Sequence, residues 1–333
     1  MLPPDVAESY RGRRVLVTGG LGFIGSNLAR RLVGLGSEVL LVDSLVPEYG
    51  GNLANLAGIE DAVRVNLSDV RDEHSLRVLI AGQEVLFNLA GQTSHVDSLH
   101  DPLTDLEINC RSQVSILEAC RQVNPEATVV FASTRQLYGR PRYLPVDERH
   151  PIAPADPNGV AKAAGEMYHL VYGKLYGLRC CALRLTNTYG PRMRVKDDRQ
   201  TFLGTWLRLA LQREELLIFG DGSQRRDFTF VDDAVDAFLL AAALPEADGE
   251  VFNLGGDPPL SLLELAELLI DVAEGGCYRL VPFPEERRTI DIGDYFADDR
   301  KIRDRLGWRP TVPLREGLAR ALEYYRSHPG EYW

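Results

Sequence analysis

A glycine-rich turn between an apolar strand and a helix constrains this chain more than any other feature. Residues 14–18 are apolar enough for a buried parallel strand, and residues 23–35 repeat apolar positions with a helical period. Between them, Gly19, Gly22 and Gly25 are spaced three residues apart. Such glycines allow a tight turn, close approach of the backbone to a pyrophosphate, and close packing of helix on strand. The helix N-terminus also offers free N–H groups to phosphates. The pattern predicts a dinucleotide-binding turn.

A second predicted strand, residues 38–43, ends in Asp43. A carboxylate at this point accepts hydrogen bonds from a ribose 2′-hydroxyl and repels a 2′-phosphate. We therefore expect NAD rather than NADP. The alternative is a glycine-rich turn that binds no ligand, and the agreement of strand, helix and carboxylate disfavours it.

Composition narrows the classes of protein that remain. A chain of 333 residues with 45% hydrophobic residues can form one large or two moderate domains. Its net charge of −11, without a basic run, argues against binding to nucleic acid or to an anionic membrane. The five cysteines show no metal-binding or C-x-x-C spacing, and residues 1–14 lack the apolar core of a signal peptide. We expect reduced core cysteines, no metal site, no membrane segment and a cytoplasmic location.

Strand and helix patterns alternate through the first half of the chain, which predicts an α/β fold with a doubly wound parallel sheet of the Rossmann type. The six expected strands are residues 14–18, 38–43, 63–67, 85–89, 128–132 and 180–185. We expect residues 1–185 to form an NAD-binding domain. Residues 186–333 should form mainly a smaller C-terminal α/β domain for the substrate, with some segments returning to the first domain.

Further helices are expected at four places in the second half, and strands at two. The helices are residues 202–212, 232–243, 262–274 and 314–327, and the strands are residues 251–254 and 278–282. Ser261 and Glu264 have the spacing of a capping box at the start of the third helix. Ligands of such sheets bind outside the carboxyl ends of the strands, so side chains directly after the predicted strands are candidate binding residues.

Several motifs, in this order, make the chain resemble the extended short-chain dehydrogenase/reductase family, which contains NAD-dependent nucleotide-sugar epimerases and dehydratases. They are Thr18-Gly-Gly-Leu-Gly-Phe-Ile-Gly25, Asn88-Leu-Ala-Gly91, Ser133-Thr134 with Leu137-Tyr138-Gly139, Arg184-Leu-Thr-Asn187, and Phe219-Gly-Asp-Gly-Ser-Gln-Arg-Arg226. Arg287-Arg288 and the residues from Asp298 to Trp308 resemble the C-terminal signature of the family.

The resemblance implies two sets of binding residues. Those expected at NAD are Gly19, Gly22, Phe23, Ile24, Gly25, Asp43, Ser44, Asp69, Val70, Leu89, Ala90, Gly91, Thr93, Asn109, Ser133 and Lys162. Those expected at the nucleotide-diphosphate sugar are Thr134, Arg135, Asn187, Phe219, Arg226 and Arg288, with Arg287 as a substitute for Arg288. Guanidinium groups suit this role because they form bidentate, charge-assisted hydrogen bonds with phosphate oxygens.

The family's catalytic Tyr-x-x-x-Lys pair is incomplete in this chain. Lys162 is present, but the tyrosine position is occupied by Asn158. A carboxamide does not accept a proton near neutral pH, so another group has to act as the base. The candidates are Tyr138, His95 and, as a relay, Thr134. Alternatively, Lys162 or a water chain moves the proton, or the fold is retained for binding alone.

A second departure concerns the two residues after Thr134. The family's 4,6-dehydratases have Asp-Glu there, whereas this chain has Arg135-Gln136, and neither side chain titrates near neutral pH. Standard 4,6-elimination is therefore disfavoured. Arg135 either faces an anionic substrate group, such as a uronate carboxylate, or forms a structural ion pair with Asp147 or Glu148.

Together these features predict an NAD-dependent nucleotide-sugar epimerase that acts through a transient keto-sugar, most simply by oxidation at C4. The alternatives are a nucleotide-sugar dehydratase or decarboxylase with altered acid/base residues, and a non-catalytic protein that binds NAD or a nucleotide sugar. By resemblance, the helices at residues 103–123 and 159–176 pair across a two-fold axis, which implies a homodimer.

Overall fold

The computed structural model describes residues 2–199, 201–256 and 258–333. Its centre is a parallel sheet of seven strands in the order β11-β6-β5-β4-β1-β2-β3. The strands of this sheet are β1 (Arg14–Thr18), β2 (Glu38–Asp43), β3 (Val63–Leu67), β4 (Val85–Asn88), β5 (Thr128–Thr134), β6 (Arg179–Leu185) and β11 (Val251–Asn253). The doubly wound sheet predicted from the alternating pattern is confirmed. Its strand order reverses between β1 and β4, the place where such sheets bind ligands.

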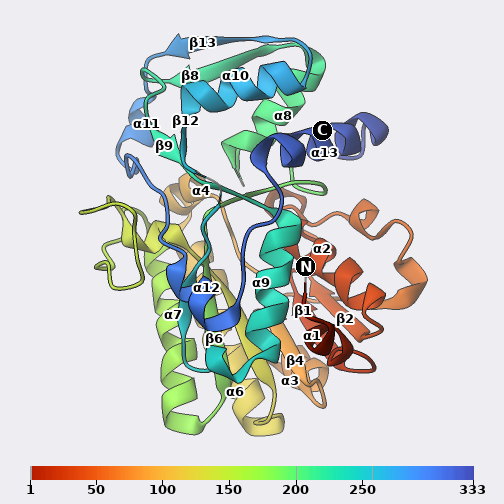
Figure 1. The fold of residues 1–333 in the computed structure, drawn as a ribbon. Coiled ribbons are helices and arrows are strands. Elements are labelled where there is room, and N and C mark those ends of the chain that lie inside the picture. Colours follow the sequence, from red (N-terminus) through yellow and green to blue (C-terminus); the bar gives the residue numbers. More distant parts are fainter. Residues whose placement is uncertain (1, 200, 257) are drawn as a thin grey trace.

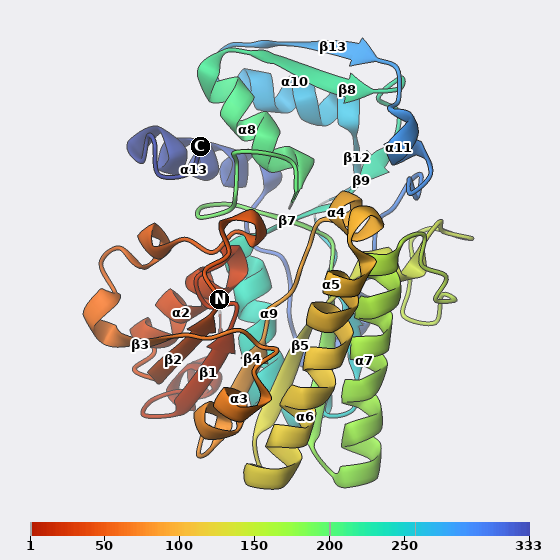
Figure 2. The same cartoon turned by 180° about the vertical axis from the view of Figure 1, so that it is seen from behind.

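Helices cover both faces of this sheet, as the two opposite views show (Figure 1 and Figure 2). One face carries α1 (Pro4–Glu8), α2 (Phe23–Gly34) and α9 (Val231–Ala243), and the other carries α3 (Glu73–Ile80), α6 (Ser112–Val123) and α7 (Pro157–Tyr176). Because both faces are covered, the central strands are apolar throughout instead of alternating, and Val15, Leu16 and Val17 are completely buried.

A smaller unit lies beyond the carboxyl ends of these strands, at the top of Figure 1. It contains the parallel pair β8 (Glu215–Phe219) and β13 (Cys277–Val281), together with α8 (Phe202–Gln212), α10 (Leu262–Val272) and α13 (Leu314–Ser327). The predicted capping box is confirmed, since Ser261 and Glu264 bond reciprocally at the start of α10. The remaining short elements are α4 (His95–His100), α5 (Pro102–Leu106), β7 (Asn187–Tyr189), β9 (Arg225–Arg226), β10 (Phe228–Phe230), β12 (Leu260–Ser261), α11 (Glu285–Arg288) and α12 (Arg300–Leu306).

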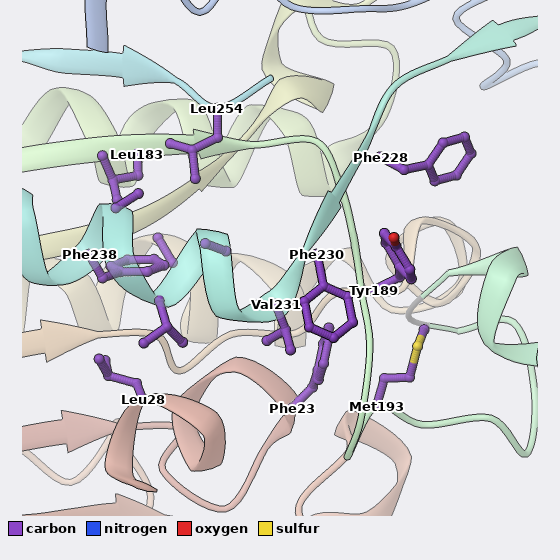
Figure 3. Close-up of a cluster of buried hydrophobic side chains, with 14 of the residues drawn as sticks. Phe23, Leu28, Leu183, Tyr189, Met193, Phe228, Phe230, Val231, Phe238 and Leu254 are labelled. Atoms are coloured by element: carbon purple, nitrogen blue, oxygen red, sulfur yellow. The ribbon is translucent and has the colours of Figure 1, made fainter. Parts of the chain in front are cut away.

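One hydrophobic core joins the two units. In Figure 3, Phe23 and Leu28 of α2 lie near Phe230 and Phe238. Tyr189 packs edge-on against Phe230, with ring centroids 5.5 Å apart. This continuous apolar contact fixes the smaller unit over the ends of the strands, which is where the candidate site is found.

Two predicted elements differ from the structure. The strand expected at residues 251–254 of the C-terminal part pairs instead with β6, as the outermost strand of the large sheet. The long helix expected at residues 103–123 is divided by a π-helical turn, Glu107–Arg111. The wider turn frees the Ile108 carbonyl, which accepts hydrogen bonds from Ser112 Oγ at 2.6 Å and Gln113 Nε2 at 3.0 Å.

Two expectations about composition can also be compared with the structure. All five cysteines are free, but Cys277 is exposed and Cys110 only half-buried, so the expectation of core cysteines holds for the other three alone. Within the described ranges, every helix is too short or too polar to cross a lipid bilayer.

Candidate active site

The glycine turn closes on itself so tightly that a side chain at Gly25 does not fit. Gly19 has a positive φ of 68°, and its carbonyl accepts the Gly22 N–H at 3.1 Å. A Cβ on Gly25 would lie 2.1 Å from the carbonyl oxygen of Gly19. The bare backbone between β1 and α2 is the form that suits a pyrophosphate at a helix N-terminus.

Asp43 stands at the end of β2, beside this turn. Its carboxylate accepts the Leu21 N–H at 2.9 Å and the Leu45 N–H at 2.8 Å. Burial raises the pKa of Asp43, and these two backbone hydrogen bonds counteract only part of that rise. An ionised carboxylate retains free lone pairs, so it can still accept bonds from ribose hydroxyls.

These elements enclose a cavity of about 280 Å³, which we call the glycine-loop pocket. It runs from Gly19 and Asp43 along the strand ends to Thr134 and Lys162. All the residues predicted to bind NAD line it except Asn109. The Asn109 amide lies behind Gly91 and donates to the Gln92 carbonyl at 2.9 Å and to Asp105 at 3.0 Å. In this structure Asn109 therefore holds the loop after β4 and does not line the pocket.

Asn158, at the position where the resemblance predicts a tyrosine, lines the pocket from the first turn of α7. Its amide nitrogen donates to the Gln92 carbonyl and to Asp105 Oδ2, both at 2.9 Å. The side chain is thus a clamp between α7, α5 and the loop after β4. Burial raises the pKa of Asp105, although hydrogen bonds from Asn158 and Asn109 oppose the rise.

Lys162 lies one helical turn beyond Asn158, on the same face of α7. Its ammonium donates to the Ala132 carbonyl at 3.2 Å and lies 5.1 Å from the centre of the Phe131 ring. Burial lowers the pKa of Lys162 to about 8, while the charge of Asp105 acts in the opposite direction. A Cβ on Gly91 would lie 2.9 Å from Nζ, so glycine there keeps the space that the lysine needs.

His95, at the start of α4, faces a buried carboxylate. Its Nδ1 lies 3.0 Å from Asp156 Oδ2, and Asp156 also accepts the Gly159 N–H at 2.7 Å and Gln136 Nε2 at 2.9 Å. Burial alone would raise the pKa of Asp156, but the nearby His95 and the hydrogen bonds from Gly159 and Gln136 together hold it below the ordinary value. The His95–Asp156 contact is an ion-pair contact without hydrogen-bond geometry. It places Nδ1 against the carboxylate and leaves Nε2 as the nitrogen available to a ligand.

Thr134 and Tyr138, the other two predicted proton carriers, differ in position. Thr134 ends β5, lines the glycine-loop pocket and accepts the Gln136 N–H at 3.2 Å, which leaves its hydroxyl proton to donate. Tyr138 is completely buried and lines neither candidate pocket. Its hydroxyl donates to Asn253 at 2.7 Å and accepts from Arg184, and burial is the main cause that raises its pKa to about 12. The structure therefore does not support Tyr138 as a base.

A second cavity of about 560 Å³, which we call the arginine pocket, adjoins the first. Arg135, Asn187, Phe219 and Arg226, four of the residues predicted to bind the nucleotide sugar, line it. Arg288 does not line it and donates instead to the Phe283 carbonyl. Arg287 takes the place predicted for Arg288: it lies 5.6 Å from the Phe219 ring and pairs with Asp198.

The five residues His95, Arg135, Gln136, Asn187 and Thr201 line both pockets and so form their common wall. Arg135 does not form the ion pair with Asp147 or Glu148 that the sequence left open. Asp147 accepts the Tyr143 hydroxyl, and Glu148 accepts the Asn253 N–H. Arg135 instead donates to Asn187 Oδ1 at 3.0 Å.

The sheet, the glycine turn and the second pocket define an α/β protein of the dinucleotide-binding class, with room for a further ligand beside the dinucleotide. Residues 15–255 match the profile of the NAD dependent epimerase/dehydratase family. The chain belongs to this family of enzymes, whose cofactor is NAD, and the predictions of family and cofactor are confirmed.

Individual relatives point in the same direction. The chain is 36% identical to a UDP-glucose 4-epimerase of Mycolicibacterium smegmatis over 94% of its own length and 99% of the relative's. A crystal structure of UDP-glucose 4-epimerase from Thermotoga maritima, with UDP-glucose, is 32% identical over 94% and 99% of the two chains, with a TM-score of 0.86. The dTDP-glucose 4,6-dehydratase DesIV of Streptomyces venezuelae, with NAD bound, is 28% identical over 96% and 98%, with a TM-score of 0.87.

Sequence reasoning missed three residues of the site, namely Gln92, Asp105 and Asp156. Asp156 precedes Pro157 at the start of α7, so its role as helix cap has a sequence signal. Its contact with His95 has none, because the two residues are 61 positions apart. Gln92 and Asp105 act through Asn158, and no local pattern indicates that contact.

Proposed function

We propose that this protein is an NAD-dependent nucleotide-sugar epimerase that acts through a transient keto-sugar, with oxidation at C4 as the simplest route. The observation that carries the proposal is the wall shared by the two pockets. A sugar held in the arginine pocket can reach the end of the glycine-loop pocket, where Thr134 and Lys162 stand. Its nucleoside diphosphate then extends toward Arg226 and Phe219.

The residues of the glycine-loop pocket fit NAD, because a bare backbone turn meets the pyrophosphate and Asp43 meets a ribose. Bound NAD would supply reversible acceptance of hydride from a sugar carbon. The chain itself has to position the sugar, shield it from water and move one proton. Lys162 contributes positive charge in the buried part of the pocket, and Thr134 can hold the reacting hydroxyl.

For proton transfer we propose His95, oriented by Asp156, in place of the missing tyrosine. Asn158 is occupied by its clamp to Gln92 and Asp105, and Tyr138 lies outside both pockets. His95 lines both pockets and presents Nε2, and histidine is the side chain that most often serves as a general base. The imidazole accepts the proton of the sugar hydroxyl and returns it when the carbonyl is reduced.

The test is turnover of nucleotide sugars in deuterium oxide, followed by NMR. The expected product is the C4 epimer without solvent deuterium, since the carbon-bound hydrogen does not exchange with water. Deuterium at C5 or loss of water would indicate a dehydratase, and loss of carbon dioxide a decarboxylase. Tight binding of NAD without turnover of any sugar would favour a binding protein.

Two variants test the assignment of the base. His95→Gln should lower turnover by about 10²–10⁴-fold, the usual contribution of a general base, without loss of NAD binding. Tyr138→Phe is the matched control, because it removes a hydroxyl outside both pockets and should retain most of the activity. Equal activity of His95→Gln and the unmodified protein would show that another group moves the proton.

We also propose a homodimer and a cytoplasmic location. Helix α7 exposes Met167, Tyr168, Val171 and Leu175, an apolar surface that a second copy can cover. Five free cysteines fit a reducing compartment. Sedimentation of the unmodified protein and of Leu175→Asp should show a dimer and a monomer, respectively.

A further inference from the structure

Arg135 is half-buried, and its guanidinium has few partners. Within the described residues, its Nη2 donates one hydrogen bond, to the neutral amide oxygen of Asn187 at 3.0 Å, and its Nη1 is buried without a partner. The face of the guanidinium lies 5.2 Å from the centre of the Tyr295 ring. Burial lowers the pKa of Arg135. A buried cation of this kind is costly unless a negative charge compensates it.

The described part of the chain does not supply that charge at close range. Among the described residues, no carboxylate oxygen lies within 4.0 Å of the Arg135 guanidinium. The charges of Asp227 and Asp291 act on it from beyond that distance. Asp227 is buried and accepts the Ala297 N–H, and burial raises its pKa to about 6, so it is mostly ionised near neutral pH. Its single charge acts on both Arg135 and Arg226. Asp291 lies 3.8 Å from Arg226 and is shared with that residue.

A second buried guanidinium increases the local positive charge. Arg226 lines the same pocket, and its pKa falls to about 10, mainly through burial and then through the charge of Arg135. Two arginines that repel each other inside one pocket form a site for an anion. Arg226 is the residue that the family resemblance assigns to the diphosphate, which leaves Arg135 for a different negative group.

Arg135 and Arg226 differ in position, which supports different roles in binding the ligand. Arg135 belongs to the wall shared with the glycine-loop pocket, directly after Thr134, and therefore to the sugar end of the cavity. Leu217, Phe219 and Phe283 line only the arginine pocket, and these apolar and aromatic side chains suit a nucleobase. Arg226 and Arg287 line only the arginine pocket.

We propose that the substrate is a nucleotide uronate, whose sugar carboxylate is bound by the guanidinium of Arg135. This inference rests on the proposed function, because it assumes that the arginine pocket holds a nucleotide sugar. A carboxylate matches the planar fork of arginine and supplies a negative charge in direct contact with Arg135, which no described carboxylate does. It also explains why arginine is tolerated in a buried position beside the reacting end of the sugar.

Binding, measured by calorimetry with NAD present, tests the proposal without turnover. The probes are free UDP, GDP and dTDP, and pairs of their sugar nucleotides that differ only at C6, with a hydroxymethyl or a carboxylate group. For at least one nucleotide, the uronate should bind roughly 10- to 100-fold more tightly than its neutral partner, the range of one charge-assisted contact. Equal affinities within every pair would overturn the proposal.

Arg135→Gln should remove the preference while the affinity for the neutral sugar and the free diphosphate stays within about threefold. Glutamine can still donate to Asn187, so the fold should be retained. NAD affinity and thermal unfolding of the variant check that it is folded. Arg149→Gln is the control for net charge, since Arg149 has a side chain that is 93% exposed. If Arg135→Gln weakens all three ligands equally, Arg135 binds the diphosphate and the uronate proposal is wrong.

The outcome for the proposed function is separate. A uronate preference that depends on Arg135, without any turnover, would retain this inference and reject the epimerase. Epimerisation of neutral sugar nucleotides, with no preference for a uronate, would support the epimerase and reject the uronate proposal.

Discussion

Gly25→Ala tests whether the tight turn is what allows the pocket to form. The new Cβ would lie 2.1 Å from the Gly19 carbonyl oxygen and 2.9 Å from both Gly19 C and Gly20 Cα. All three are backbone atoms, so no side chain can rotate away. Contacts below 3.0 Å are essentially never seen, so the turn and the helix have to separate by at least 0.9 Å, the difference between 3.0 and 2.1 Å.

This displacement has a calculable cost. Overpacking of a close contact costs about 1–3 kcal/mol. The Gly22 N–H to Gly19 carbonyl bond, which crosses the same contact, is worth about 1 kcal/mol more if it breaks. We expect unfolding free energy to fall by about 2–4 kcal/mol. If only 2 kcal/mol of this strain persists in the complex, NAD should bind about 30-fold more weakly.

The assays are urea denaturation and calorimetric titration with NAD. Gly34→Ala is the matched control, because Gly34 ends the same helix and a Cβ there meets no atom within 4 Å. The control should be unchanged or slightly more stable, since alanine is the better helix former. If Gly25→Ala binds NAD and unfolds like the control, the steric argument for the turn is refuted.

Three further predictions concern the other end of the pocket. In Asp156→Asn, the new amide nitrogen faces either His95 Nδ1 and Gln136 Nε2 or, if the amide flips, the Gly159 N–H. Turnover should therefore fall by about 10²-fold or more, while NAD affinity is retained. Unchanged turnover would exclude an orienting role for Asp156. Lys162→Met should stabilise the NAD-free protein at neutral pH, because it removes a buried charge. This gain should shrink as pH rises from about 8 toward 10.5, because the unfolded lysine chain then binds more protons than the native one, and the stability of the lysine protein increases by about 3 kcal/mol. Urea titrations of both proteins at the two ends of this pH range test the prediction. Tyr138→Phe should cost about 1–3 kcal/mol of stability, from its buried partner Asn253, yet change turnover little; loss of activity in a folded variant would return Tyr138 to the catalytic candidates.

Local sequence predicted the regular elements well where a single period dominates. The bounds of β1, β2, β3, α8 and α13 agree with the ranges expected from apolar patterning. The elements missed outright include β7, β9, β10 and β12, which have two or three residues each. Strands this short do not repeat the two-residue alternation often enough to be recognised, and they depend on pairing with segments distant in the sequence.

Helix geometry explains why Arg287, and not Arg288, lines the arginine pocket. Arg287 and Arg288 are adjacent, and on a helix successive side chains point about 100° apart, so only one of them can line the arginine pocket. The sequence contains both residues, and only the packing of α11 selects Arg287. In the same way, the position of Tyr138 in its motif did not reveal that Arg184 and Asn253 enclose its hydroxyl.

The sequence by itself determined the cofactor turn, because spacing of glycines, strand, helix and Asp43 are all local properties. It also predicted, by resemblance, that Asn158 stands where a tyrosine base is expected. The proposal that His95 takes over this role depends on contacts that only the tertiary structure contains. His95 and Asp156 follow different strands, and they meet because parallel strands deliver their carboxyl ends to one edge of the sheet. The isolation of the Arg135 charge is likewise a tertiary property, since it depends on which carboxylates the fold keeps away.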